Sequence, residues 1–350
     1  MNEFSEYELR EVSPNFKLSM SSVNRLLSSC GLKYEKTDYM AAMFDEDNNA
    51  IACGGYDGNT IKCLAVDEAQ RGSGVFNKLI THLIQKLYYE GNESVNVFTK
   101  PENEKIFVSL GFKLLAKADK AVFMEKGNGL DNYLNDLEKY KKEGTNGAVV
   151  VNCNPFTNGH LHLIEYASKL CDNLYVFVVS EDKAVFPAEV RYELVKKGVS
   201  HINNAIVLHG GKYIISSATF PSYFLKEYSD VTKAHTTIDC SLFSRFIAKK
   251  LEITKRFVGE ELTDRVTLEY NRTMEEMLCE YGFEPLVKIP RLRDNEGKII
   301  SASVVRQYIA EDRFDDIKQI VPESTYKYLK SAEALQVIER IKNDYRERRT

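Results

Sequence analysis

The chain has 350 residues, 43% of them hydrophobic and 28% charged, which is enough apolar material for cores and a length typical of two domains. Its net charge of −4 lacks the basic excess typical of nucleic-acid-binding proteins, so we expect no nucleic-acid partner. The first residues carry no basic and apolar leader, and no apolar run nears the roughly 18 residues of a membrane helix, so we expect no membrane association. Seven scattered cysteines without a CxxC pair predict reduced thiols in the cytoplasm.

Residues 1–127 alternate predicted strands with predicted helices. Short strands broken by Asp, Asn and Gly turns are expected within 41–66, and another strand at 95–100. Apolar residues at helical spacing predict a helix over 75–87, and a second over 104–110 that Gly111 ends. This pattern predicts a first α/β domain.

A change of character follows residue 127, where two glycines flank an asparagine. Residues 128–146 are expected to form a connector that contains a short amphipathic helix. The second domain is then expected to occupy 147–350 and to end in C-terminal helices.

The second domain begins as a strand–helix–strand unit. A continuous apolar run at 147–152 predicts a buried parallel strand, followed by a helix at 159–170, a strand at 174–180 and a helix at 188–198. Further strands are expected in the segments AIVLHG (205–210), TTIDC (236–240), KRFVGEE (255–261) and PLVKIP (285–290). The alternation predicts a doubly wound parallel sheet of the Rossmann-like kind, with ligands outside the carboxyl ends of its strands.

The turn after the first strand of this sheet reads Asn-Pro-Phe-Thr-Asn-Gly-His over 154–160. A helix that opens there points free N–H groups at a ligand, Gly159 permits close approach of backbone, and His160 can donate to an anionic oxygen. These features predict a cradle for a nucleotide phosphate. The same residues also fit a plain strand–turn–helix that Thr157 caps.

A second candidate anion site lies at Ser301-Ala302-Ser303-Val304-Val305-Arg306, just before a predicted helix. Ser301 or Ser303 can cap that helix, and Arg306 follows Ser303 by one turn on the same side. Capping serines beside a surface arginine remain the alternative explanation.

Together the two segments resemble the signatures of the nucleotidyltransferase superfamily. Thr157, Gly159 and His160 occupy the fixed positions of its T/HxGH signature, with Thr157 where some members carry a first histidine. The serine-rich run that ends at Arg306 resembles the second signature. The resemblance implies that ATP is bound by Asn154, Pro155, Phe156, Gly159, Ser301 and Ser303.

The segments 213–226, 236–261, 270–271 and 300–309 resemble the citrate lyase ligase family, and the resemblance extends from about 130 to 330. It implies ATP-dependent acetylation of the prosthetic-group thiol of the citrate lyase acyl carrier protein. Acetate and that carrier are the implied partners, acetyl-adenylate is the intermediate, and AMP and pyrophosphate are released.

Within this implied mechanism His160 and Arg306 neutralise phosphate charge, while Thr157 and Ser303 donate hydrogen bonds. Acetate is already ionised at pH 7 and needs no general base. Mg²⁺ is expected to bridge the triphosphate, held mainly by phosphate oxygens and water. The sequence does not determine which protein residues bind the metal.

Four further residues are candidates for ATP binding. Lys183 and Arg191 flank the start of the 188–198 helix, where they fit either a phosphate contact or solvated surface charges. Asp239, at the end of a predicted strand, is a candidate for ribose or magnesium, and Gly259 lies near the end of another.

The first domain resembles the GNAT acetyltransferases. Its Arg71-Gly72-Ser73-Gly74 turn leads into a helix, and a later helix ends in Gly-Phe. The bulky Phe76 departs from the family pattern and argues against acetyltransferase activity. A retained pocket would hold a coenzyme-A-like arm at Arg71, Gly72, Gly74 and Asn103. A purely structural first domain is the alternative.

Three other functions share parts of this pattern. An adenylyltransferase acting on phosphopantetheine or nicotinamide mononucleotide shares both signatures but leaves the first domain unexplained. A non-catalytic nucleotide-binding regulator is disfavoured by the intact His160 and Arg306. An active acetyltransferase in the first domain is disfavoured by Phe76.

Overall fold

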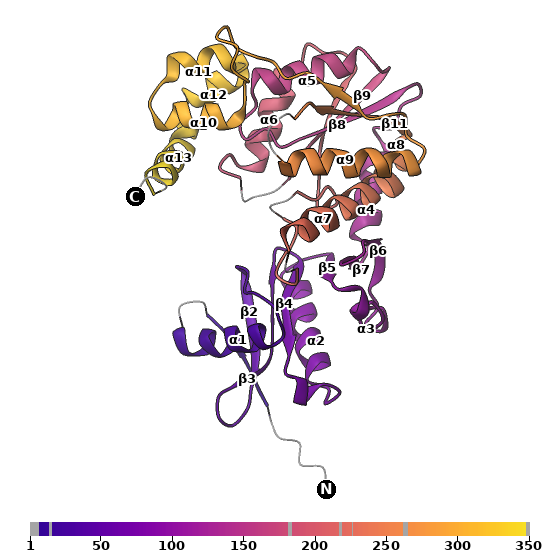
Figure 1. Cartoon of the computed structure of the whole chain (residues 1–350), viewed down its shortest axis with the longest axis vertical. Helices are drawn as coiled ribbons and strands as arrows, with labels where there is room; N and C mark the ends of the chain where they lie inside the picture. Colours follow the sequence, from indigo (N-terminus) through magenta and orange to yellow (C-terminus); the bar gives the residue numbers. More distant parts are fainter. Residues whose placement is uncertain are drawn as a thin grey trace. The chain divides into compact units, whose positions relative to one another are not determined.

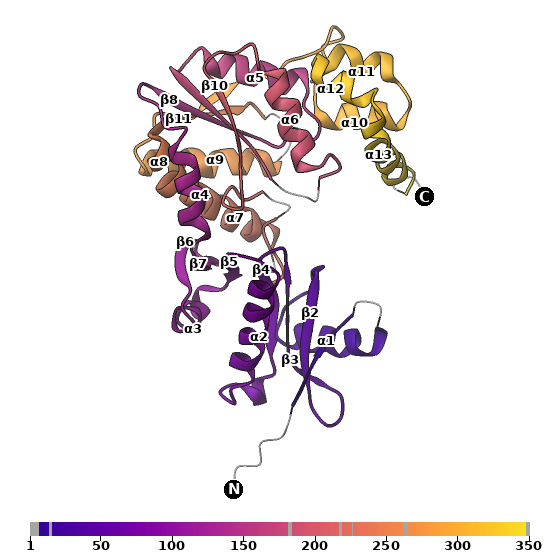
Figure 2. The same ribbon diagram turned by 180° about the vertical axis from the view of Figure 1, so that it is seen from behind.

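The structure is a computed structural model that describes residues 7–13, 16–180, 184–216, 219–225, 227–261 and 265–347 (Figures 1 and 2). The chain divides into two compact units, Met1–Asn132 with Phe220–Ala234, and Tyr133–Thr219 with His235–Thr350. The divisions fall inside α4 (Gly129–Glu138) and α7 (Tyr228–Leu242), so each of these helices begins in the first unit and ends in the second. The sequence did not predict that 220–234 groups with the first unit.

The strands described in the first unit form one mixed sheet in the order β1-β2-β3-β4-β5-β7-β6. Its pairs are antiparallel except β4 with β5. The strands are β1 (Glu8–Glu11), β2 (Tyr39–Phe44), β3 (Ala50–Asp57), β4 (Thr60–Val66), β5 (Ser94–Thr99), β6 (Lys113–Lys117) and β7 (Val122–Gly127). The helices are α1 (Lys17–Ser29), α2 (Val75–Tyr89) and α3 (Glu104–Ser109).

Helix α2 shows why this unit folds as the sequence predicts. Its side chains at helical spacing, Val75, Leu79, Leu83 and Leu87, are all buried against the sheet. Gly74 precedes the helix in a left-handed conformation, φ 85°, which glycine adopts without strain. The turn before α2 therefore depends on glycine.

The strands described in the second unit form a parallel sheet in the order β10-β9-β8-β11-β12, which confirms the doubly wound prediction. They are β8 (Asn146–Val151), β9 (Asn173–Val178), β10 (Ala205–His209), β11 (Ile253–Gly259) and β12 (Val287–Ile289). Helices α5 (Asn158–Ser168) and α6 (Ala188–Gly198) share a core on one face. Helices α7 and α9 (Arg265–Glu280) lie on the other (Figure 1). The order reverses between β8 and β11, and the carboxyl ends of these strands are where doubly wound sheets bind ligands.

The prediction of a strand at TTIDC, 236–240, is wrong because these residues belong to α7. Two threonines and an isoleucine favour a strand locally, and a short apolar run does not distinguish a strand from a buried helix. In the structure Thr236 and Ile238 are fully buried, so packing decides the conformation of this segment. A π-helical segment, Phe243–Ala248, and the short α8 (Lys249–Leu251) follow α7.

The C-terminal helices gather beside α6, as both views show (Figures 1 and 2). They are α10 (Ala302–Ala310), α11 (Phe314–Ile320), α12 (Glu323–Leu329) and α13 (Leu335–Glu347). Val305 and Ile309 of α10 pack with Ile317 and Ile341 in a separate apolar cluster. This packing fixes α10, whose N-terminus carries the serine-rich segment. Among the described residues, no helix has both the length and the apolar character needed to cross a bilayer.

Candidate active site

The segment after β8 is organised by reciprocal hydrogen bonds between Thr157 and His160. Thr157 caps α5, and its Oγ1 accepts from the N–H of His160 at 3.4 Å. The N–H of Thr157 donates to Nδ1 of His160 at 3.1 Å. Because a backbone N–H can only donate, Nδ1 acts as the acceptor and the ring proton lies on Nε2. The capping box thus leaves His160 with Nε2–H as a hydrogen-bond donor.

His160 is neutral at pH 7. Burial, and then the positive charge of Arg291, lower its pKa to about 4. Its ring packs beside Phe156, with ring centroids 6.2 Å apart. The expectation that His160 neutralises phosphate charge therefore changes: this side chain can donate a hydrogen bond to an anion but brings no positive charge.

The N-termini of α5 and α10 meet at Gly159. A Cβ on Gly159 would lie 2.8 Å from the carbonyl oxygen of Ile300, so only glycine permits this approach. Ser301 caps α10, and its Oγ accepts from the N–H of Val304 at 3.3 Å. The free N–H groups of two helices therefore lie at one edge of the sheet.

Arg306 joins the two predicted segments. Its guanidinium donates through Nη1 to the carbonyl oxygen of Asn154 and through Nη2 to Oγ of Ser303, the latter at 3.2 Å. Ser303 therefore contacts Arg306, whereas Ser301 is the residue that caps α10. The structure thus brings Asn154, Gly159, His160, Ser301, Ser303 and Arg306 together.

Arg291 is a charged residue of this region that the sequence prediction missed. It lies just past β12, and its Nε donates to the carbonyl oxygen of Glu260 at 2.8 Å. Its Nη2 also pairs with the carboxylate of Glu261. Its positive charge is, after burial, the second cause that lowers the pKa of His160. The available signal was its position directly after the predicted strand 285–290, at the edge where parallel sheets bind ligands.

Arg191 is placed where it cannot contact a ligand in this structure. It has no solvent exposure, and its Nε donates to the carbonyl oxygen of Phe186 at 3.0 Å. Its Nη1 donates to the carbonyl oxygens of Asn152 and Val179, at 2.8 and 2.7 Å. Arg191 therefore holds the ends of β8 and β9, which differs from the predicted phosphate contact. Lys183 lies outside the described residues.

Asp239 is in α7 and not at the end of a strand. It is 4% exposed, and its carboxylate accepts from the N–H of Ile215 at 2.8 Å and from the hydroxyl of Tyr270 at 2.6 Å. Asp239 therefore binds the backbone of the loop after β10. The predicted role was a contact with ribose or magnesium.

The remaining predicted ATP contacts divide between the surface and the core. Gly259 ends β11, and a Cβ there would meet no atom within 4 Å, so this position is open. Pro155 and Phe156 are buried, and Phe156 packs in the core of this unit. Among the described residues, no group of three His, Cys, Asp or Glu side chains could hold a metal ion.

The first unit contains a cavity of about 700 Å³ that the predicted arm-binding residues line. Arg71, Gly72, Gly74 and Asn103 all border it. Phe76 stands in its wall and packs edge-on against Phe107, with ring centroids 6.1 Å apart. Tyr223 and Phe224 also line the cavity; they belong to the segment Phe220–Ala234, which is part of this unit.

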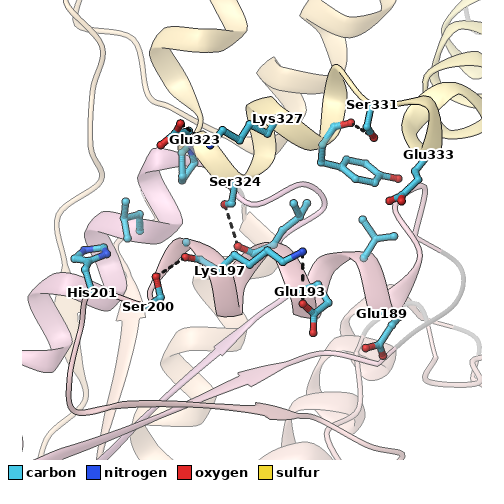
Figure 3. Close-up of a pocket in the computed structure, with 16 residues that line it drawn as sticks. Glu189, Glu193, Lys197, Ser200, His201, Glu323, Ser324, Lys327, Ser331 and Glu333 are labelled. Atoms are coloured by element: carbon cyan, nitrogen blue, oxygen red, sulfur yellow. Dashed lines mark hydrogen bonds and ion pairs between the residues drawn. The ribbon is translucent and has the colours of Figure 1, made fainter.

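A second hollow, of about 840 Å³, lies in the other unit between α6 and α12 (Figure 3). Charged side chains of both helices border it, and they pair within each helix: Lys197 with Glu193 at 3.7 Å and Lys327 with Glu323 at 2.9 Å. None of the predicted site residues lines this hollow, so we do not assign it to the site around His160.

Sequence and structure comparisons relate this chain to known proteins. A family model described as the citrate lyase ligase C-terminal domain matches residues 146–329. A relative named [citrate [pro-3S]-lyase] ligase from Haemophilus influenzae is 37% identical over 318 residues, which cover 89% of this chain and 95% of the relative. The protein of the same name from Escherichia coli is 38% identical, with 89% and 90% covered.

Other matches are partial. A phosphopantetheine adenylyltransferase from Clostridium botulinum is 39% identical over 77 residues, which cover 21% of this chain and 44% of the relative. A solved GNAT family N-acetyltransferase from Escherichia coli is 15% identical, with a TM-score of 0.28, and covers 36% of this chain and 84% of the other.

Proposed function

The chain belongs to the citrate lyase ligase family, and from this premise we propose that its second unit forms acetyl-adenylate from acetate and ATP. It is a ligase that activates citrate lyase by acetylation, with acetate and the citrate lyase acyl carrier protein as its substrates. The adenylate then acetylates the prosthetic-group thiol of that carrier.

In the first step a carboxylate oxygen of acetate attacks the α-phosphorus, and the bond to the bridging oxygen breaks as pyrophosphate leaves. Acetate is ionised at pH 7, so no residue need act as a general base. The site instead positions the reactants and stabilises charge on the leaving group. Nε2–H of His160, the guanidinium of Arg306 and the N–H groups of α5 and α10 are the donors we assign to that task.

In the second step the carrier thiolate attacks the acetyl carbonyl carbon, and AMP leaves with the oxygen that bridged the two groups. No cysteine of this chain is needed as the nucleophile. Cys153, next to the site in sequence, is buried, and burial raises the pKa of its thiol far above neutrality. We therefore assign Cys153 a packing role.

We propose that Mg²⁺ binds this site together with the nucleotide. Triphosphate oxygens and water would supply most of its ligands, as Mg²⁺ prefers in nucleotide sites. When bound, it would supply positive charge at the triphosphate. Every residue role assigned above stands without a protein–metal contact.

The observation that carries this proposal is the convergence of His160, Arg306 and two helix N-termini at the carboxyl edge of β8. Exchange of labelled pyrophosphate into ATP by the purified chain with Mg²⁺ tests it. We expect exchange that depends on acetate, and its loss in His160→Ala. His162→Ala, two residues later on the same helix, is the matched control and should keep the exchange rate.

Exchange that requires phosphopantetheine or nicotinamide mononucleotide in place of acetate would contradict this proposal and support a simple adenylyltransferase. ATP binding without any exchange or product would support a nucleotide-binding regulator. The partial match to the phosphopantetheine adenylyltransferase, over 21% of the chain, does not favour that activity over the ligase reaction.

The cavity of the first unit supports a second proposal, that it binds the carrier's coenzyme-A-like arm. Gly72 and Gly74 have positive φ angles, and Cβ atoms there would meet nothing within 4 Å, so this turn leaves space for a pyrophosphate. Arg71 lines the same cavity, with its side chain 65% exposed. A photoreactive phosphopantetheine analogue should label this unit, and Arg71→Ala should weaken the labelling. Labelling of the second unit alone would contradict the proposal.

A further inference from the structure

The charge around His160 points to one more ligand-binding residue. Pyrophosphate leaves with several negative charges, and charge-assisted hydrogen bonds bind such anions most strongly. His160 is neutral, and Arg191 is fully buried in contacts with backbone carbonyl oxygens. Of the cations predicted from the sequence and described by the structure in this unit, Arg306 alone reaches the site. A polyanionic leaving group would be bound more strongly by a second positively charged side chain.

We propose that Arg291 is a second anion-binding guanidinium of this site, held by Glu261 and directed at the leaving pyrophosphate. The inference rests on the proposed function for its ligand, but its geometry stands on the described residues. Arg291 follows β12, the strand that pairs with β11, and the N–H of Glu260 donates to the carbonyl oxygen of Ile289 at 2.8 Å. The C-terminal ends of β11 and β12 are therefore hydrogen-bonded to each other two residues before Arg291.

The chain also connects Arg291 to Gly159. The N–H of Ile300 donates to the carbonyl oxygen of Leu292 at 3.0 Å, and the carbonyl oxygen of Ile300 is the atom that a Cβ on Gly159 would meet at 2.8 Å. Ile300 thus links Leu292, the residue after Arg291, to the N-terminus of α5. The effect of Arg291 on His160 agrees with this placement.

Glu261 has the properties of a positioning residue. Its side chain is 6% exposed, whereas that of Arg291 is 35% exposed. The described contacts of Arg291, through Nε to Glu260 and through Nη2 to Glu261, use two of its five N–H donors. A buried carboxylate thus fixes one side of the guanidinium while part of the side chain remains accessible to solvent and to a ligand.

Binding of inorganic pyrophosphate, measured by calorimetry on the full chain with Mg²⁺, tests the inference directly. We expect Arg291→Met to weaken binding at least about tenfold, and Arg291→Lys to keep part of the affinity because lysine retains the charge without the planar fork. Arg293→Met is the matched control: Arg293 lies two residues on, and its Nη1 donates to the carbonyl oxygen of Gly297 in a turn. It should bind pyrophosphate as the unaltered chain does.

A second readout locates the charge independently of ligand binding. NMR titration of His160 should give a higher pKa in Arg291→Met than in the unaltered chain, because a nearby positive charge has been removed. Pyrophosphate binding by Arg291→Met equal to that of the unaltered chain would overturn the inference. Absence of acetate-dependent exchange in the unaltered chain would instead contradict the proposed function, and the pyrophosphate measurement would still decide the role of Arg291.

Discussion

Replacement of Gly159 by alanine tests whether the two helix N-termini must meet. The added Cβ would lie 2.8 Å from the carbonyl oxygen of Ile300, about 0.6 Å inside the 3.4 Å of an ordinary contact. The neighbour is backbone and cannot rotate away, so the two segments must separate by roughly that distance. Overpacking of this kind costs about 1–3 kcal/mol, and the helix propensity of alanine offsets about 0.5–1 kcal/mol.

Separation of the two segments should affect catalysis more than stability. A misplacement of about 1 Å can cost roughly 100-fold in rate, so we expect Gly159→Ala to slow pyrophosphate exchange by about 10- to 100-fold. The assay combines acetate-dependent exchange with thermal unfolding. Gly259→Ala is the control for stability, because a Cβ there meets nothing within 4 Å and should leave the melting temperature unchanged. An exchange rate and a melting temperature both unchanged in Gly159→Ala would refute the reasoning.

Five further predictions follow from the site. The ring of His160 should gain no proton near pH 6.5, because its pKa is about 4, and NMR titration of the ring measures this; a midpoint near pH 6.5 would contradict it. The same lowered pKa should reduce the free energy of unfolding as the pH falls from about 6.5 to about 4, since the unfolded chain then binds a proton that the folded chain excludes, and denaturant titrations measure this. Thr157→Val removes the helix cap, so it should lower the free energy of unfolding by about 1–2 kcal/mol and slow exchange. Thr157→Ser keeps the capping hydroxyl and should keep both the stability and the exchange rate; unfolding and exchange assays measure these. Arg191→Met should lower the free energy of unfolding by about 3 kcal/mol or more, because buried carbonyl oxygens lose their donors, while the KM for ATP of the folded protein stays unchanged. Iodoacetamide should modify the exposed Cys279 before the buried Cys153 and leave exchange intact; inactivation that follows Cys153 labelling would refute its packing role.

The sequence predicted the elements whose signal is local. The apolar run at 147–152 and the helical spacing of Val75, Leu79 and Leu83 describe buried faces that the structure confirms as β8 and α2. The prediction for 236–240 failed because four of its five residues are buried, which hides the periodicity that distinguishes a helix from a strand.

The sequence motifs of the candidate site were recognisable, and its electrostatics were not. Gly159, His160 and Arg306 were found because their spacing resembles two known signatures. The neutral state of His160 was not, because it depends on burial and on the charge of Arg291, which lies 131 residues away along the chain. Arg191 and Asp239 were predicted as ligand contacts from their positions next to predicted elements. Their burial against backbone groups has no sequence signal and could not be predicted.

Transfer of oxygen from acetate to AMP tests the central claim most directly. With acetate labelled by ¹⁸O in both carboxylate positions, ATP, Mg²⁺ and the deacetylated carrier protein, mass spectrometry of the products follows each oxygen. Attack of the carboxylate on the α-phosphorus predicts one labelled oxygen in the phosphate of AMP and one in the acetyl group of the carrier. Unlabelled AMP, or ADP and phosphate as products, would contradict formation of acetyl-adenylate.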